Sequence, residues 1–279
     1  MKKIKIDAPA KINLTLDITG TDGGYHQLNS LVTTIALKDV ITIKKRSDNK
    51  VTIKEKGILS GCDEKQNNAY KTAVAFIDEF KTCGVDITIN KSIPVGGGLG
   101  GSSADISAVL NGMKKLFGIE KSVVPLSKAL GSDTTYMLEG GLKVISGRGE
   151  NITPVNAKLK LYLLLITAES SVSAGACYKR FDEQGVTYPP VTENAVKELE
   201  IGNKLKFLSL LKNDLYPPAK SLVPQIEQNL LSLKSLGCAF MTGSGSVVVG
   251  AYSSKKQLNK AYKTLYPTYT NKLIKTKTI

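Results

Sequence analysis

A run of glycine most restricts how this chain can fold: five of the six residues from Gly96 to Gly101 are glycine. Before the run, apolar and polar residues alternate from Val85 to Asn90, which is typical of a half-buried β-strand. After it, apolar residues recur at helical spacing from Ile106 to Phe117, and Gly118 is a typical C-terminal stop. The order strand, glycine loop, helix is therefore predicted.

The glycine loop has the chemistry of an anion-binding site. The first N–H groups of a helix have no partner within the helix and carry the positive end of its dipole. Glycine lets this backbone approach a polyphosphate closely, and Ser102 and Ser103 add hydroxyl donors. We therefore expect the segment to bind phosphate groups. The structural alternative is a flexible turn in which one of these serines is an ordinary N-cap.

Two common nucleotide-binding motifs fit the loop poorly. Gly96, Gly98 and Gly101 match the spacing G-x-G-x-x-G, but the dinucleotide-binding fold has a continuously apolar strand before it, and here the strand alternates. A P-loop requires lysine where Ser102 stands. The loop therefore predicts a phosphate site of another kind.

The N-terminal segment predicts a strand with polar residues along one face. Every even position from Ile4 to Ile18 is apolar, and most odd positions are polar. This alternation places Lys11 and Asn13 on the same face. Pro9 is expected to mark a bend or a strand junction, because proline cannot donate to a sheet ladder.

The remaining periodicities predict an α+β protein of two domains that join near residue 155. In the first domain, strands are expected at 39–44 and 51–55 and a helix at 67–80. The second domain follows the order βαββαβ, a ferredoxin-like layout, apart from one additional helical segment. Its predicted strands are 160–167, 237–242, 246–252 and 270–276, and its predicted helices are 192–212, 221–236 and 254–265.

Composition narrows the possible functions. His26 is the only histidine, which excludes two-histidine metal sites and leaves a Ser-His-Asp triad only if His26 itself takes part. The formal net charge of +14 indicates anionic partners: a nucleotide, a phosphorylated metabolite or a nucleic acid. No apolar run reaches the ~20 residues of a membrane-spanning helix, and the first residues do not resemble a signal peptide, so a soluble, cytoplasmic protein is expected.

The cysteines are predicted to be buried free thiols. No two of them form a C-x-x-C pair, and a chain of this length does not need disulfides to fold. They are Cys62, Cys83, Cys177 and Cys238.

Three ordered blocks resemble the GHMP kinases, the family of galacto-, homoserine, mevalonate and phosphomevalonate kinases. Pro94–Asp105 resembles that family's phosphate-binding motif, Pro9–Leu14 its N-terminal motif and Thr242–Ser246 its C-terminal motif. The resemblance extends over nearly the whole chain. It implies a kinase that transfers the γ-phosphate of ATP to a hydroxyl group of a small molecule.

Further blocks resemble one branch of the family, whose members phosphorylate the 2-hydroxyl group of 4-diphosphocytidyl-2-C-methyl-D-erythritol in non-mevalonate isoprenoid biosynthesis. The most specific is Gly24-Tyr25-His26, followed by Leu28 and Ser30. Three others occur in the expected order: Gly131-Ser132-Asp133, Gly140-Gly141 and Gly147-Arg148-Gly149-Glu150.

The resemblance also implies an architecture and a set of ligands. Residues 1–155 would form a ribosomal-protein-S5-domain-2-like domain and residues 156–279 a ferredoxin-like domain, with the active site in the cleft between them. ATP and Mg²⁺ are implied, with Ser103 as one candidate for the metal and no carboxylate assigned to it. The partners would be ATP and a cytidine-diphosphate-linked acceptor, with no membrane and no nucleic acid, and the protein would be a monomer or a homodimer.

By the same resemblance Lys11 and Asp133 are the catalytic pair. A carboxylate within hydrogen-bond reach of an alcohol can take its proton as the phosphoryl bond forms. A neighbouring lysine keeps that carboxylate ionised and stabilises charge on the attacking oxygen or the γ-phosphate. The structural alternatives are a lysine on a half-buried strand and an aspartate that caps a helix at 134–138.

The resemblance assigns the binding residues as well. In the substrate site, His26 would hydrogen-bond the cytosine, Tyr25 and Tyr178 would stack on it, and Asn13 would contact the methylerythritol end. For Tyr25, Tyr178 and Asn67 a core or capping role is the alternative. The ATP-binding residues would be Pro94, Gly96, Gly97, Gly98, Leu99, Gly100, Gly101, Ser102, Ser103 and Asn67, and Gly243 and Ser244 would complete the substrate site.

The sequence departs from the family's pattern at two places, and two alternative functions stay open. An arginine common before the Gly-Tyr-His block is absent from Gly20–Gly23, and Thr134–Met137 replaces the usual Val-Pro-Phe-Phe. The chain could instead be another GHMP kinase, acting on mevalonate, homoserine or a sugar. It could also be an RNA-binding protein on an S5-like fold, although its basic residues are scattered and only 6% of its residues are aromatic.

Overall fold

The computed structural model describes residues 2–279, which divide into two compact units that are discontinuous along the chain. Unit 1 comprises the described residues of Met1–Ala10, Leu37–Val95 and Gly100–Gly140. Unit 2 comprises Lys11–Ala36, Gly96–Leu99 and Gly141–Ile279. The units do not follow a single cut along the chain, and the domain boundary expected at residue 155 stays a prediction.

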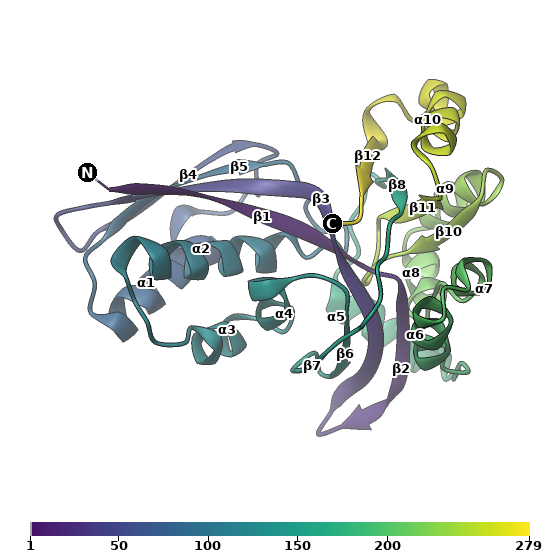
Figure 1. The fold of residues 1–279 in the computed structure, drawn as a ribbon, viewed down its shortest axis with the longest axis horizontal. Helices are drawn as coiled ribbons and strands as arrows, with labels where there is room; N and C mark the ends of the chain where they lie inside the picture. Colours follow the sequence, from purple (N-terminus) through teal and green to yellow (C-terminus); the bar gives the residue numbers. More distant parts are fainter. Residues whose placement is uncertain (1) are drawn as a thin grey trace. The chain divides into compact units, whose positions relative to one another are not determined.

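Unit 1 contains a mixed sheet. Its central strand β5 (Val85–Lys91) pairs antiparallel with the second half of β3 (Tyr25–Lys45) and parallel with β4 (Val51–Gly57). Strand β1 (Lys3–Asn13) pairs with β3 (Figure 1). In β5 buried and less buried residues alternate, as the sequence predicts for a strand with one face in the core.

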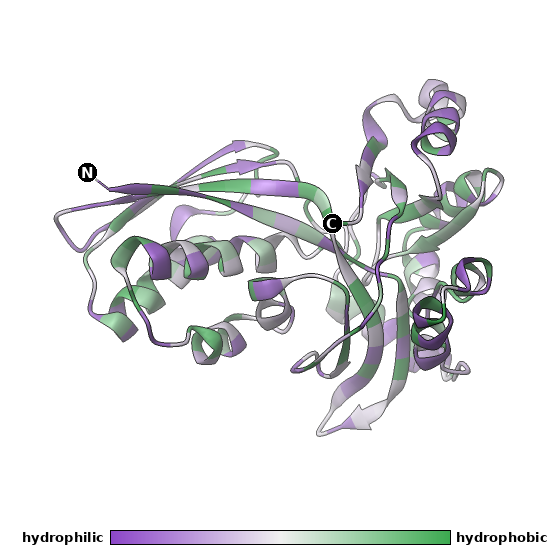
Figure 2. Cartoon of the chain, in the orientation of Figure 1, coloured by the Kyte–Doolittle hydropathy of each residue, from purple (hydrophilic) through white to green (hydrophobic). Residues whose placement is uncertain are grey.

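Helices cover one face of this sheet. They are α1 (Asn68–Phe80), α2 (Gly101–Phe117), α3 (Val124–Leu130) and α4 (Thr134–Glu139), and a short 3₁₀ turn η1 (Glu64–Gln66) precedes α1. Helix α2 packs closely on the sheet, because a Cβ atom at Gly112 would lie only 2.6 Å from the Ile43 side chain. Both α1 and α2 carry hydrophilic and hydrophobic residues, as helices with one buried face do (Figure 2).

Unit 2 contains a second group of strands around the first half of β3. Strand β2 (Thr15–Asp22) and strand β6 (Lys143–Gly147) both pair antiparallel with β3, and β7 (Asn151–Pro154) pairs with β6. The short strand β9 (Lys212–Asn213) runs parallel to β2.

A separate four-stranded antiparallel sheet also belongs to unit 2. It contains β8 (Tyr162–Ile166), β10 (Cys238–Met241), β11 (Val248–Tyr252) and β12 (Leu273–Lys277), in the order β10-β11-β8-β12. The other elements of this part are α5 (Ala174–Gln184), α6 (Thr192–Glu200), α7 (Lys204–Ser209), α8 (Tyr216–Leu222), α9 (Gln225–Lys234), α10 (Lys255–Tyr269) and η2 (Thr270–Lys272).

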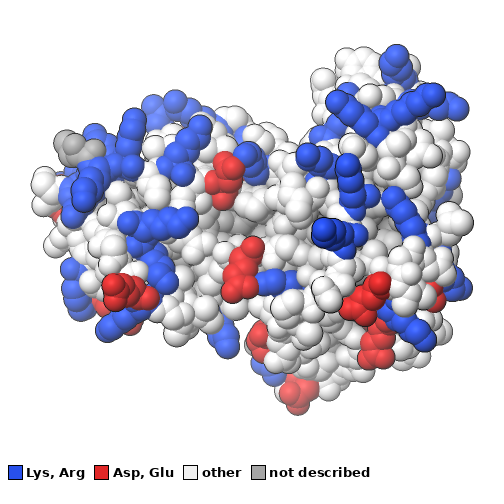
Figure 3. Space-filling model, in the orientation of Figure 1, with Lys and Arg blue, Asp and Glu red and all other residues white. Residues whose placement is uncertain are grey.

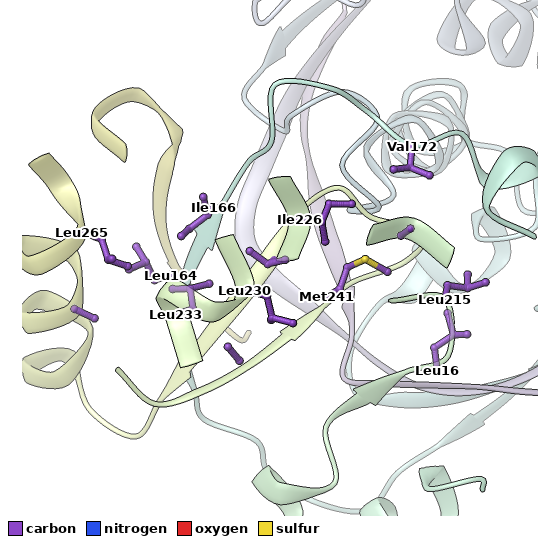
Figure 4. Close-up of a cluster of buried hydrophobic side chains, with 14 of the residues drawn as sticks. Leu16, Leu164, Ile166, Val172, Leu215, Ile226, Leu230, Leu233, Met241 and Leu265 are labelled. Atoms are coloured by element: carbon purple, nitrogen blue, oxygen red, sulfur yellow. The ribbon is translucent and has the colours of Figure 1, made fainter. Parts of the chain in front are cut away.

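The core of unit 2 lies between this sheet and its helices. Leu164 from β8, Met241 from β10 and Leu230 and Leu233 from α9 belong to one buried cluster (Figure 4). Leu265 from α10 joins the same cluster. Because each of these elements buries an apolar face in a shared core, the sheet and its helices stabilise one another.

The structure corrects several expectations from the sequence. Pro9 lies inside β1 and the strand ends only after Asn13; the chain tolerates this proline because β1 pairs with β3 alone. The single helix expected at 192–212 is divided into α6 and α7, where Gly202 has a φ of +77°. The helix expected at 221–236 begins after Pro224. Of the cysteines expected to be buried only Cys177 is; Cys62 is exposed, and Cys83 and Cys238 are half-buried.

Among residues 2–279, none of the helices has both the length and the apolar character needed to span a lipid bilayer.

Candidate active site

In unit 2 the glycine loop lies directly against the turn that follows β10. A Cβ atom at Gly98 would overlap the carbonyl oxygen of Thr242, and one at Gly243 would lie 2.8 Å from Cα of Gly98. The Val247 N–H donates to the carbonyl oxygen of Gly97 at 3.4 Å. Both glycines also have positive φ, 74° at Gly98 and 58° at Gly243. Only glycine fits at these two positions, so the two motifs form one surface of bare backbone.

Lys11 is tied to this loop. Its backbone N–H donates to the carbonyl oxygen of Leu99 at 2.9 Å. Its side chain is only 5% exposed, and Nζ donates to Oδ1 of Asn13 at 2.6 Å. The lysine predicted to be catalytic is therefore a buried cation with a defined orientation, and the alternative of a lysine on a solvated strand face does not hold.

Asn13 connects Lys11 to the turn after β10. Besides Lys11, its Oδ1 accepts the N–H of Gly243 at 3.1 Å, and its own backbone N–H donates to Oγ1 of Thr242 at 2.9 Å. Its Nδ2 donates to Oγ of Ser30 at 2.8 Å. Asn13 therefore positions the Lys11 ammonium, and the contact with the acceptor expected from the sequence stays a prediction.

Asp133 lies in unit 1 at the N-cap position of α4, but its side chain makes no capping hydrogen bond to that helix. The structural alternative of a helix cap is therefore not realised. Helix α4 is held at both ends by α2: Oγ of Ser107 donates to the Thr134 carbonyl at 2.8 Å, and Nδ2 of Asn111 donates to the Leu138 carbonyl at 2.9 Å. The helix that begins in the glycine loop therefore fixes the segment that carries Asp133.

The start of α2 differs from an ordinary capped helix. Its N-cap is Gly100, with φ of 68° and no side-chain capping bond, so neither Ser102 nor Ser103 has the N-cap role of the structural alternative. The Ser102 hydroxyl accepts Nδ2 of Asn68 at 2.6 Å. The first N–H groups of α2 consequently have no side-chain cap, which is what binding of an anion requires.

Asn67, expected to contact adenine, has a structural role as well. It is the N-cap of α1, where its Oδ1 accepts the Ala69 N–H at 2.9 Å. Its Nδ2 donates to Oε1 of Glu55 at 2.8 Å. The capping alternative is therefore realised, and an adenine contact by this residue stays a prediction.

Two of the three residues expected around a cytosine lie together in unit 2. The rings of His26 and Tyr178 are stacked, with centroids 4.7 Å apart and an angle of 23° between the planes. Phe181 meets His26 edge-on at 5.9 Å, and Nε2 of His26 lies 2.7 Å from Oδ1 of Asp182. We name His26, Tyr178, Phe181 and Asp182 the aromatic cluster. His26 and Tyr178 stack on each other and Nε2 of His26 is paired with Asp182, so binding of a cytosine by these residues stays a prediction.

The ring of Tyr25 packs against an arginine side chain. The guanidinium of Arg148 lies over its ring, 4.2 Å from the centroid. Arg148 also donates to the carbonyl oxygen of Asp22 at 3.3 Å. Tyr25 is 61% exposed, so one face of the ring packs against a cation while much of the side chain faces solvent.

Sequence reasoning missed several of these residues as parts of the site. Asn68, Asp182 and Arg148 act through partners far along the chain, and no local spacing indicates such contacts. Ser30 belongs to the motif block after His26 but was not assigned a role, because residues 30–35 do not alternate and gave no sign of which way it faces.

The positions of charged side chains and of possible metal ligands add two observations. Lysine and arginine side chains are spread over the face shown in Figure 3 rather than gathered on one element. Within residues 2–279 there is no group of three or more His, Cys, Asp or Glu side chains that could hold a metal ion. The hydroxyl of Ser103, in unit 1, is an oxygen ligand of the kind that Mg²⁺ prefers, and its role stays a prediction.

Comparison with known proteins gives a consistent result. Residues 67–142 match the model of the GHMP kinases N terminal domain. A relative from Macrococcus caseolyticus (strain JCSC5402), named 4-diphosphocytidyl-2-C-methyl-D-erythritol kinase, is 33% identical over 258 residues, covering 90% of this chain and 91% of that protein. A relative of the same name from Desulfitobacterium hafniense (strain Y51) is 35% identical over 271 residues, covering 92% and 90%.

Solved structures share the fold. A crystal structure of 4-(cytidine 5'-diphospho)-2C-methyl-D-erythritol kinase has a TM-score of 0.83 and 24% identity, with 99% of each chain covered. Mevalonate kinase from L. major, solved in complex with R-mevalonate, has a TM-score of 0.76 at 16% identity and covers 99% of this chain and 95% of that one. At these identities the solved structures show a similar fold and no more. Membership of a family is shown by the two more similar relatives above.

Proposed function

Since the chain belongs to the 4-diphosphocytidyl-2-C-methyl-D-erythritol kinases, a branch of the GHMP kinases, we propose that it transfers the γ-phosphate of ATP to the 2-hydroxyl group of 4-diphosphocytidyl-2-C-methyl-D-erythritol. The two relatives at 33% and 35% identity carry that name and align over about nine-tenths of their length. The chain would act in isoprenoid precursor synthesis in the cytoplasm, with ATP as its phosphate donor.

The observation that supports this proposal best is the hydrogen bond of 2.9 Å between the Lys11 N–H and the Leu99 carbonyl. It fixes the strand that carries the buried lysine against the backbone of the glycine loop. A phosphate bound by that loop would therefore meet a cation whose side chain is already oriented. Preorganised charge of this kind stabilises a transition state without further rearrangement.

In the proposed reaction Asp133 accepts the proton of the acceptor hydroxyl. The oxygen then bonds to the γ-phosphorus, the bond from that phosphorus to the β–γ bridging oxygen breaks, and ADP leaves. Lys11 stabilises the negative charge that develops on the phosphoryl oxygens. In unit 2 Lys11 bonds to Leu99, and in unit 1 Asp133 precedes a helix held by α2, which starts at Gly101.

We propose Ser103 as the residue of this chain that would hold Mg²⁺. When bound, the ion would neutralise charge on the β- and γ-phosphates. Magnesium keeps several waters and binds substrate phosphates, so a site with few protein ligands suits an ion that arrives with ATP.

On the acceptor side we propose that the aromatic cluster and Tyr25 bind the cytosine, and that Gly243 and Ser244 contact the acceptor. The architecture proposed with this function is an S5-domain-2-like N-terminal domain and a ferredoxin-like C-terminal domain, with the substrates in the cleft between them. The strand order β10-β11-β8-β12 supports the second of these names, and so does the element order β8, α9, β10, β11, α10, β12 once the inserted elements α5 to α8 and β9, which follow β8, are set aside. The spread of positive charge over the face drawn in Figure 3 gives no support for RNA as the partner.

An acceptor panel tests the proposal. The purified protein is incubated with ATP and Mg²⁺ and with 4-diphosphocytidyl-2-C-methyl-D-erythritol, mevalonate, homoserine or galactose, and ADP formation is followed. Turnover is expected only with the cytidine-linked acceptor. Equal or faster turnover of mevalonate would reject the assigned acceptor, and tight RNA binding with no ATP turnover would reject the kinase itself.

A further inference from the structure

A buried charged cluster in unit 1 has no role in the reaction described above. Lys91, at the end of β5, places Nζ 2.6 Å from Oδ2 of Asp39 and 2.5 Å from Oδ2 of Asp105. The three residues are 7%, 0% and 6% exposed. One ammonium thus joins two carboxylates that lie on β3 and on α2.

The cluster holds both ends of the glycine loop. At the entrance, Oδ1 of Asp39 accepts the N–H of Ser92 at 2.5 Å and that of Ile93 at 2.8 Å. At the exit, Asp105 belongs to the first turns of α2. A Cβ atom at Gly101 would lie 3.0 Å from the Ile93 side chain, so the two ends also pack against each other.

This arrangement suits a loop that binds through backbone N–H groups. Glycine loses more conformational freedom on ordering than any other residue, so a free glycine loop would have to be ordered when ATP binds. Fixing both ends in advance lowers that entropic cost, because fewer conformations remain accessible to the segment between them.

We propose that Lys91, held between Asp39 and Asp105, is a positioning residue for the ATP phosphates, because its ammonium ties the strand that enters the glycine loop to the helix that leaves it. The inference rests on the proposed function, since it assigns a role in binding the phosphate donor. It predicts that loss of the contact between Lys91 and Asp105 weakens ATP binding more than it weakens acceptor binding or slows the chemical step.

The buried site also shows why both carboxylates are present. Oδ1 of Asp105 is buried and has no hydrogen-bond partner among the described residues. The pKa of Lys91 is raised, because the two carboxylates outweigh its own burial. The lysine therefore stays charged at neutral pH and bridges the two carboxylates.

The experiment compares two variants of one position. Asp105→Ala removes the tie and leaves the Lys91–Asp39 pair balanced in charge. Asp105→Asn removes the same charge but keeps an oxygen that can accept from Lys91. We expect Asp105→Ala to raise the KM for ATP by about tenfold or more, with kcat and the KM for the acceptor within about threefold of wild type. Asp105→Asn should keep the KM for ATP within about threefold.

A matched control lies at the other end of the same strand. Asp86 on β5 pairs with Arg46 at 2.5 Å, and Arg46 keeps Asp48 as a second partner. Asp86→Ala therefore also removes one carboxylate from an ion cluster of unit 1, but away from the glycine loop. Its KM for ATP should equal that of wild type.

A second variant and a second measurement distinguish a local loss of order in the loop from misfolding of the whole protein. Asp39→Asn keeps an acceptor for the loop N–H groups and leaves the Lys91–Asp105 pair that joins strand to helix, so it should keep the KM for ATP within about threefold. Hydrogen exchange at residues 95–101 should become faster in Asp105→Ala but not in Asp39→Asn, with protection of β8 and β11 unchanged in both.

The outcomes separate the two proposals. Equal effects of Asp105→Ala and Asp105→Asn, parallel changes in both KM values, or wild-type KM for ATP in a folded Asp105→Ala protein would overturn the role of Lys91 and leave the kinase assignment intact. If the wild-type protein fails to bind ATP, measured directly by calorimetry, both proposals fall together.

Discussion

The flanks of the glycine loop in unit 1 and the aromatic cluster in unit 2 solve two recognition problems by different means. At the flanks, Lys91, Asp39 and Asp105 are at least nine-tenths buried and hold backbone. In the aromatic cluster, His26 keeps 13% of its side-chain surface exposed, and its partner Asp182 keeps 58%. The first region is buried and charged within the core, and the second is a half-buried group of rings with an exposed carboxylate beside it.

The difference corresponds to what each region is proposed to bind. A triphosphate is recognised by many N–H groups that must converge, so their backbone has to be fixed before binding. A base is recognised by stacking and a few hydrogen bonds, and rings at the surface can adjust to it at small cost. Changes to the loop and its reaction partners should therefore have larger effects than changes to the aromatic cluster.

The largest effect is expected at the reaction centre. Asp133→Asn should lower kcat by roughly 10²–10⁴, as for loss of a general base, with little change in the KM for ATP. Steady-state kinetics with both substrates provides the test. Asp78→Asn, which removes an exposed partner of Lys81, is the control and should keep the wild-type kcat. Full activity of Asp133→Asn would remove this residue from the mechanism.

The next largest effect is expected in the glycine loop. In Gly98→Ala the new Cβ would overlap the Thr242 carbonyl and require a φ of +74°, so the loop must shift. We expect kcat/KM for ATP to fall on the order of 10²-fold, since small misplacements of binding groups have effects of that size.

Gly202→Ala is the control for Gly98→Ala, because it introduces the same backbone strain without a steric clash. Gly202 has a similar φ of +77°, but no atom lies within 4 Å of a Cβ at that position. This variant should therefore lose some stability and keep its affinity for ATP. Equal kinetic losses in both variants would contradict a specific role for the contact between Gly98 and Thr242.

A smaller effect is expected in the aromatic cluster. His26→Ala removes the ring stacked on Tyr178 and should raise the KM for the acceptor about tenfold, because stacking contributes ~1–3 kcal/mol per base. The KM for ATP should not change. Tyr266→Ala removes a ring that is 44% exposed on α10 and serves as the control. If His26→Ala raised the KM for ATP, the glycine loop and the aromatic cluster would not bind separate substrates.

The smallest effect concerns the pH dependence of stability. Because burial raises the pKa of Asp105 to about 7, the folded protein keeps a proton that the unfolded chain releases above pH ~4. This contribution to stability is complete below pH ~4 and is lost as the pH rises to 7. Asn at this position does not titrate.

Thermal unfolding at several pH values measures that contribution. Between pH 5 and pH 7.5 the Tm of wild type should fall relative to that of Asp105→Asn by a few degrees, since ~1 kcal/mol corresponds to ~2–4 °C for a protein of this size. A difference in Tm that is the same at both pH values would show that Asp105 has an ordinary pKa in the folded state.

The sequence predicted the parts of the fold that have clear local signals. Helix α2 and its stop at Gly118, and the alternating strand β5, were found where expected. The first half of β3 was missed, because its residues from Ser30 to Ile35 are all buried and do not alternate. A strand that is buried on both faces has no period of two.

The same distinction applies to the site. Lys11 and the glycine loop were recognisable because their motifs are continuous in the sequence. Lys91, Asp39 and Asp105 were missed, since their cluster forms only when β3, β5 and α2 come together, and no spacing along the chain indicates it. The orienting role of Asn13 likewise depends on Gly243, which lies at the other end of the chain.

The most direct test of the central claim is a crystal structure of the protein with a non-hydrolysable ATP analogue and 4-diphosphocytidyl-2-C-methyl-D-erythritol. The account predicts that N–H groups of the glycine loop contact the β- and γ-phosphates, and that the acceptor's 2-hydroxyl lies within hydrogen-bond reach of Asp133, with Lys11 beside the γ-phosphate. A triphosphate bound away from the loop, or an acceptor 2-hydroxyl outside hydrogen-bond reach of Asp133, would contradict it.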